Sequence, residues 1–277
     1  MIMKKILLAF DSTNFSEAVF EFVKRLNEIS PVLAVGVFLP QTNYSNLWSY
    51  AAAASASTGI PYIPLIEEEE AATVEKNIEH FEELCQKNGI AYRVHKDVFD
   101  FAFPELQEQS RFADVVILSG QMFYEGVAGD QFDYLRDALH SMECPVLIVP
   151  EHYSFPCNNI LAYDGSRESV HAIKQFAYIF PELAENPSVL VWAEMEEKEF
   201  PSKRQITELV TTHYRDVTFY KLDFIPKKYF STWVNSKKAA ILISGSFSRS
   251  ILSQVFKHSF VKEVIVNHEI PVFIAHK

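Results

Sequence analysis

The chain has 277 residues, with proportions of apolar (48%) and charged (22%) residues that exclude a wholly disordered or fibrous protein. Its 25 Lys and Arg against 36 Asp and Glu give a net charge of −11, which opposes binding to nucleic acid or to an anionic membrane surface. No apolar run approaches the ~20 residues that a membrane-spanning helix needs. At roughly 150 residues per domain, the length favours two domains.

The first ten residues contain two lysines followed by a short apolar run, which stops at Asp11. No cleavage site follows, so we interpret this segment as a buried strand rather than a signal peptide. The three cysteines, Cys85, Cys144 and Cys157, stand at wide spacings with no C-x-x-C pair and no histidine at ligand spacing. We therefore expect reduced thiols in a cytoplasmic protein, and we expect no metal site.

An internal repeat organises the chain. Residues 6–11 and 160–164 are both apolar strands that end in Asp. Each is followed by apolar residues three or four apart, which predicts an amphipathic helix. The expected N-caps of these helices are Ser12 or Thr13 in the first copy and Ser166 in the second, with Glu17 and Glu168 in the first turns.

The remaining elements alternate in the same order in both copies. The first copy predicts strands at 32–39, 92–98, 115–120 and 146–149, with helices at 67–88 and 101–112. The second copy predicts strands at 188–193, 217–222, 240–245 and 272–275, with helices at 201–214 and 227–236. A fourth helix precedes the closing strand in each copy. The glutamates at 67–70 are expected to open their helix, where its dipole stabilises negative charge.

Strands that alternate with helices predict an α/β fold: two tandem open parallel five-stranded sheets with helices on both faces. We expect one domain over residues 1–153 and a second over 158–277, joined by a short polar linker. Residues 40–66 are an insertion in the first domain. This insertion either folds back over its own sheet or presents a surface to an unidentified protein partner.

These strand ends resemble those of the universal stress protein family in its tandem two-domain form. The resemblance is carried by Asp11 and Asp164, by Ser119-Gly120 and Ser244-Gly245, and by Cys-Pro-Val-Leu-Ile-Val at 144–149. It implies Rossmann-like domains that pair through their last strands, here within one chain, and a non-enzymatic part in the stress response. Whether two chains associate further as a homodimer stays open.

Nucleotide-binding members of that family resemble one another in a G-2x-G-9x-G-(S/T) loop after the fourth strand. Its glycines let backbone N–H groups approach phosphate oxygens. Counting from Gly245, Ser248 and His258 replace the second and third glycines, and only Ser259 keeps its type. Counting from Gly120 in the first domain, Phe123 takes the second position and Phe132 or Asp133 the third. The first domain is therefore expected to have lost triphosphate binding.

The second domain is the better candidate for a ligand, because Arg249 and the serines around it can hydrogen-bond a phosphate. An ATP or AMP bound there would contact Asp164, Gly165, Gly245, Ser246, Ser248, Arg249, His258 and Ser259; the corresponding candidates of the first domain are Asp11 and Gly120. In the alternative interpretation the serines cap the fourth helix, Arg249 pairs with an acidic surface, and the aspartates are turn residues. No motif places a catalytic group.

Overall fold

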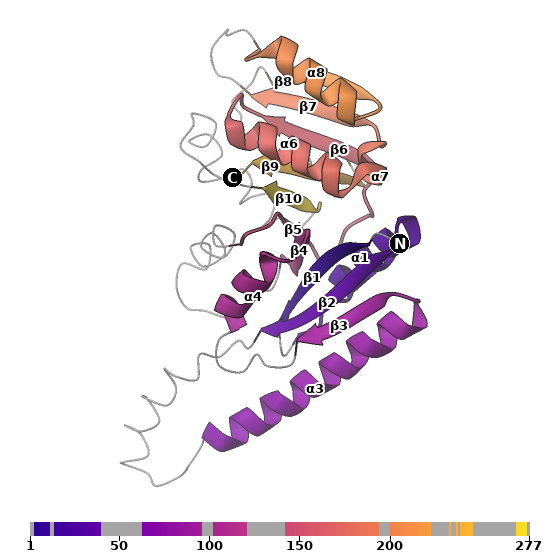
Figure 1. The fold of residues 1–277 in the computed structure, drawn as a ribbon, viewed down its shortest axis with the longest axis vertical. Helices are drawn as coiled ribbons and strands as arrows, with labels where there is room; N and C mark the ends of the chain where they lie inside the picture. Colours follow the sequence, from indigo (N-terminus) through magenta and orange to yellow (C-terminus); the bar gives the residue numbers. More distant parts are fainter. Residues whose placement is uncertain are drawn as a thin grey trace, which may run out of the picture.

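The computed structural model describes residues 3–11, 14–39, 63–95, 102–120, 142–193, 200–222, 233, 237, 239–245 and 270–275. The strands of these residues form one sheet of ten in the order β3-β2-β1-β4-β5-β10-β9-β6-β7-β8 (Figure 1). The strands are β1 (Lys4–Asp11), β2 (Val32–Leu39), β3 (Ala91–His95), β4 (Val115–Ser119), β5 (Val146–Val149), β6 (Asn158–Tyr163), β7 (Ser188–Ala193), β8 (Val217–Leu222), β9 (Ala240–Gly245) and β10 (Val272–Ala275).

All neighbouring strands run parallel except β5 and β10, which are antiparallel. From this central pair outward the order is β5-β4-β1-β2-β3 on one side and β10-β9-β6-β7-β8 on the other. We call these two sets, with their helices, the first half and the second half. Within each half the first strand lies beside the fourth. The chain therefore reverses direction across the sheet between β1 and β4, and again between β6 and β9, where open α/β sheets bind their ligands.

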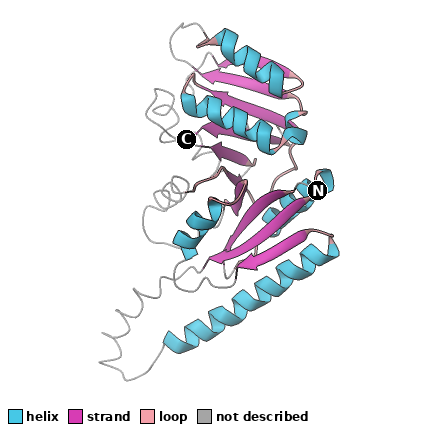
Figure 2. Ribbon diagram, in the orientation of Figure 1, coloured by secondary structure: helices cyan, strands magenta, loops and turns pink. Residues whose placement is uncertain are grey.

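Helices cover both faces of the sheet, as expected for a doubly wound α/β fold. The described helices are α1 (Glu17–Ile29), α3 (Ile63–Lys87), α4 (Ala102–Ser110), α6 (Arg167–Ile179), α7 (Pro181–Ala184) and α8 (Lys203–His213). Buried side chains of α1, α3, α6, α7 and α8 pack into one hydrophobic cluster, and Leu106 of α4 packs into the cluster on the opposite face. Figure 2 shows α6 and α8 together over the strands of the second half.

The strand predictions agree closely with the structure. The predicted bounds at 32–39, 146–149, 188–193, 217–222, 240–245 and 272–275 are those observed. The strand β6 begins two residues earlier than predicted and ends at Tyr163, so that Asp164 follows it directly. Long apolar runs explain this agreement for the inner strands, because a strand that is buried on both faces needs apolar side chains on both sides. The edge strand β8 is mostly exposed, and its alternating pattern predicted it.

The predicted start of the first helix is wrong. The N-cap of α1 is Ser16, whose Oγ accepts a hydrogen bond from the backbone N–H of Val19 at 3.2 Å, and not Ser12 or Thr13. Phe15 lies before the helix, with its ring stacked 4.6 Å from that of Phe10. In the second half Ser166 is the N-cap of α6, as predicted.

The start of α3 also differs from the prediction. This helix begins at Ile63, so the last four residues of the expected insertion are helical. Pro64 is compatible with this start because the first turn of a helix tolerates proline. The glutamates at 67–70 therefore lie inside the helix rather than at its N-terminus. Residues 40–62, the fourth helix of each copy, and most of the helix predicted at 227–236 fall outside the described residues.

The two halves meet along β5 and β10, where Phe273 pairs in register with Leu147. The Phe273 ring is buried and lies 5.3 Å from that of Phe176 on α6. An ion pair adds to this junction, because Nζ of Lys4 on β1 lies 2.9 Å from a carboxylate oxygen of Glu182 on α7. Among the described residues, the halves are thus joined by backbone pairing of β5 with β10, by apolar packing that includes Leu147 and Phe273, and by the Lys4–Glu182 ion pair.

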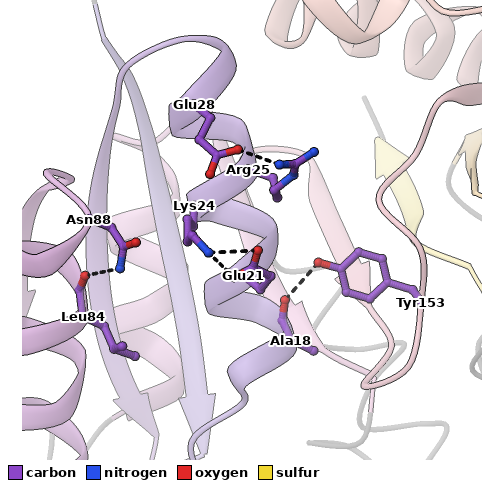
Figure 3. A network of polar contacts seen from close by, with 8 residues as sticks. All are labelled: Ala18, Glu21, Lys24, Arg25, Glu28, Leu84, Asn88 and Tyr153. Atoms are coloured by element: carbon purple, nitrogen blue, oxygen red, sulfur yellow. Dashed lines mark hydrogen bonds and ion pairs between the residues drawn. The ribbon is translucent and has the colours of Figure 1, made fainter.

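The segment between β5 and β6 packs along α1. The Tyr153 hydroxyl donates a hydrogen bond to the Ala18 carbonyl at 3.2 Å (Figure 3). The Phe155 ring lies 5.1 Å from that of Phe22, and the Arg25 guanidinium lies 5.6 Å from the centre of the Phe155 ring. The stretch that the sequence suggests is a simple polar linker is therefore held against the first half by aromatic contacts.

Candidate ligand site at the carboxyl ends of the strands

In the second half, Asp164, Gly165 and Ser166 form a tight turn between β6 and α6. The Asp164 Oδ1 atom accepts a hydrogen bond from the Ser166 backbone N–H at 2.9 Å. Gly165 has a φ of +78°, a left-handed conformation that glycine adopts without strain. Ser166 Oγ in turn accepts a hydrogen bond from the Ser169 N–H at 3.1 Å, which caps the helix. Asp164 thus has a local structural role, and its half-buried carboxylate lies beside the N-terminus of α6.

Gly245 ends β9 directly against the first turn of α6. A Cβ atom added at Gly245 would lie 2.5 Å from the Glu168 carbonyl carbon and 2.7 Å from the backbone N of Ser169. No side chain fits in that space, so the close approach of the helix backbone to the strand requires glycine here. The structure thus brings Asp164, Gly165 and Gly245 together around the start of α6. Packing alone is enough to explain why residue 245 is a glycine.

An aromatic cluster covers the neighbouring strand ends, and the sequence analysis did not single it out. The Phe200 ring stacks 5.5 Å from that of Tyr163 at the end of β6 and lies 5.1 Å from the ring of Trp192 near the end of β7. The Tyr163 hydroxyl donates to the Pro201 carbonyl at 2.8 Å, and burial raises its pKa. An added Cβ at Gly165 would lie 3.0 Å from the Pro201 ring. Phe200 and Pro201 therefore border the Asp164 turn on the side of β7.

The first half has a polar cluster at the same edge of the sheet. The hydroxyls of Ser16, at the start of α1, and of Ser119, at the end of β4, each donate a hydrogen bond of 2.7 Å to Oε1 of Glu151. The predicted candidate Gly120 is buried, and its N–H donates to the Val149 carbonyl at 2.9 Å. Asp11 is the last residue of β1, and its side chain lies outside the described part.

Sequence reasoning missed Glu151, which begins the polar stretch at 151–159 that the sequence suggests is a linker. Ser246, Ser248, Arg249, His258 and Ser259 lie outside the described residues, and so do Phe123, Phe132 and Asp133. Their candidate roles stay predictions.

Within the described ranges, no group of three His, Cys, Asp or Glu side chains could hold a metal ion. Cys85 and Cys144 are buried free thiols, and Cys157 is an exposed one. Burial raises the pKa of both buried thiols to about 12, so neither is a thiolate near neutral pH. Among the described helices, none has the length and apolarity to cross a membrane.

No protein-family model matches the sequence, and no curated protein matches it significantly. Solved structures do match. A universal stress protein from Archaeoglobus fulgidus DSM 4304 is 16% identical, covers 99% of this chain and 96% of its own, and gives a TM-score of 0.70. A putative universal stress protein from Pseudomonas aeruginosa UCBPP-PA14 is 11% identical, covers 99% of this chain and 93% of its own, and gives a TM-score of 0.50.

A universal stress protein solved in complex with cAMP is 15% identical, covers 44% of this chain and 98% of its own, and gives a TM-score of 0.33. That superposition is too poor to support an argument about a ligand of this chain. The likeness to the A. fulgidus protein extends over both halves and the junction between them, and it agrees with the α/β architecture. The chain therefore has the fold of the universal stress proteins along nearly its whole length.

Proposed function

We propose that this chain is a tandem universal stress protein that acts in the stress response by binding, without catalysis, in the cytoplasm. The fold likeness over 99% of the chain carries this proposal. The same strand order on both sides of the β5–β10 pair supports the tandem form. The two buried thiols are poor nucleophiles because burial raises their pKa, and no sequence motif places another catalytic group.

The ligand that the second half suits best is an adenine nucleotide. The Asp164 carboxylate can accept hydrogen bonds from sugar hydroxyls or from a base, and it lies beside the N-terminus of α6, whose dipole favours an anion. The Ser166 and Ser244 hydroxyls lie at this edge of the sheet, half-buried. The sequence that follows Gly245 adds Arg249 and further serines. The nucleotide's phosphates would face that segment.

A thermal-shift titration with ATP, ADP and AMP, each with and without Mg²⁺, tests this function. Saturable stabilisation should grow with the logarithm of ligand excess over the dissociation constant. The variant Asp164→Asn should abolish the shift: its amide oxygen still accepts from the Ser166 N–H and so keeps the turn, but the charge is gone. Asp11→Ala, at the same place in the first half, is the matched control and should leave the shift unchanged.

Chromatography of the nucleotide after incubation tests the absence of catalysis, and we expect it to be recovered intact. Release of phosphate that grows with the amount of protein would contradict the non-enzymatic proposal. A flat thermal response at millimolar nucleotide would refute nucleotide binding and would favour a protein partner as the ligand.

A further inference from the structure

We propose that Glu151 is an intramolecular anion that closes the strand ends of the first half to phosphate-bearing ligands. This inference deepens the proposed function, because it assigns ligand binding to one half of the chain and names the residue that prevents it in the other. Glu151 lies two residues after β5, where the chain leaves the sheet toward α1. Its carboxylate reaches back to the edge at which β1 and β4 end.

The geometry is that of a held anion. Two hydroxyls from different elements, Ser16 of the α1 cap and Ser119 of β4, converge on the same oxygen of Glu151 at 2.7 Å each. Hydrogen bonds to a carboxylate are stronger than those to a neutral acceptor. Ser16 also accepts from the Val19 N–H, so the carboxylate lies at the positive end of the α1 dipole. Glu151 therefore occupies the hydroxyl donors, and the positive end of the α1 dipole, that a phosphate would need.

Among the described residues of the second half, the corresponding serines have other hydrogen-bond partners. Ser166 caps α6 as Ser16 caps α1, and Ser244 precedes Gly245 at the end of β9 as Ser119 precedes Gly120 at the end of β4. In this half the Ser166 hydroxyl donates to Oγ of Ser169, and the Ser244 hydroxyl donates to the Gly245 carbonyl. Neither of these hydrogen bonds involves a carboxylate, so both hydroxyls can turn toward a ligand without displacing a charged group.

The negative charge of Glu151 also acts on any ligand that approaches these donors. A carboxylate repels a phosphate, and at about 4 Å in water each pair of unit charges changes affinity on the order of fivefold. The pattern predicts that the first half refuses anions which the second half accepts.

The experiment measures phosphate-induced thermal stabilisation at constant ionic strength, with inorganic phosphate replacing chloride. Glu151→Ala should unfold roughly 2 to 4 °C below the wild type in chloride, because both serines lose their acceptor. Added phosphate should then restore much of the loss in a saturable manner, because it binds the vacated donors. Glu83→Ala is the matched control: it removes one exposed carboxylate from α3 and should respond to phosphate only as the wild type does.

A second variant keeps the test valid if Glu151→Ala does not fold. Glu151→Gln retains an oxygen acceptor for the serines but no charge, so its phosphate response should fall between those of the wild type and the alanine variant. Adding Ser119→Ala to either variant should reduce the response. Equal responses of the wild type and both Glu151 variants would overturn the proposal.

The outcome is separable from that of the proposed function. The phosphate response of Glu151→Ala should persist when Asp164→Asn is added, because it arises in the first half. The nucleotide response of the wild type depends on Asp164 and should not change in Glu83→Ala. A phosphate response of Glu151→Ala that disappears with Asp164→Asn would place the effect in the second half and would overturn the inference.

Discussion

Replacing Gly245 with alanine tests the close packing of α6 on β9. The added Cβ would lie 2.5 Å from the Glu168 carbonyl carbon and 2.7 Å from its oxygen, whereas ordinary contact begins at 3.4 Å. The obstructing atoms are backbone, so a side-chain rotation cannot relieve the clash. The first turn of α6 must move, although its next turns are fixed by the buried side chains of Ala172, Ile173 and Phe176.

Overpacking costs about 1–3 kcal/mol, and a clash with a fixed backbone belongs at the upper end of that range, so we expect Gly245→Ala to lower the free energy of unfolding by about 3 kcal/mol. The assay is urea unfolding, followed by tryptophan fluorescence and by far-UV circular dichroism, with coincident transitions as the condition for a two-state analysis. A loss below about 1 kcal/mol would refute the packing argument.

Two other glycines provide matched controls. Gly89 has a φ of +63° and no atom within 4 Å of an added Cβ, so Gly89→Ala carries only the cost of the left-handed conformation, about 1 kcal/mol. At Gly36 the nearest atom is in the Phe81 ring, 3.0 Å away, and a ring can shift. Gly36→Ala should therefore cost about 1–2 kcal/mol, less than Gly245→Ala. The order of these costs depends on geometry and not on whether a ligand binds.

Two further predictions concern thiols and pH. Ellman's reagent should label Cys157 at once, but Cys85 and Cys144 only on unfolding. Raising the pH to about 9 should not make the two buried thiols react, because their pKa is about 12 and they stay protonated. Burial raises the pKa of Glu182, but its hydrogen bond with Lys4 and the other interactions outweigh this and lower it below its ordinary value of 4.5. The pair therefore stabilises the fold above that value and loses its effect as the pH falls through the lowered pKa. Lys4→Met should lower the free energy of unfolding by about 1 kcal/mol at pH 7 and by progressively less as the pH falls below 4.5 in urea titrations; a loss that does not change with pH would contradict this account.

Most of the sheet could be predicted from the sequence because its inner strands are continuous apolar runs, a signal that resides in each strand separately. The edge strands β3 and β8 are more exposed and show an alternating pattern instead. The start of α1 could not be predicted. Phe15 fits the apolar spacing of the helix, but it is partly buried because its ring packs on Phe10 and on His80 before the helix begins. Periodicity registers that a side chain is buried, and it does not distinguish burial inside a helix from burial beside one.

The site was predicted less completely, for a similar reason. Gly245 ends a strand and Asp164 directly follows one, so local sequence suffices to place them at the carboxyl edge. The Glu151 cluster joins residues 135 and 32 positions apart, and no local pattern connects a residue after one strand to a cap far earlier in the chain. The same holds for Phe200, whose contacts with Tyr163 and Trp192 come from three separate segments.

The antiparallel pairing of β5 with β10 has a consequence for how the two halves can diverge. In an assembly of two identical chains, any substitution appears twice, and a residue that blocks one site blocks its twin as well. Here the two sides of the β5–β10 junction are different segments of one chain. Each half can therefore accept a substitution that the other does not share. The serines are such a difference: Ser16 and Ser119 of the first half donate to Glu151, whereas Ser166 and Ser244 of the second half donate to other groups. The covalent pair can therefore hold one closed and one open position in a fixed one-to-one ratio, independent of protein concentration.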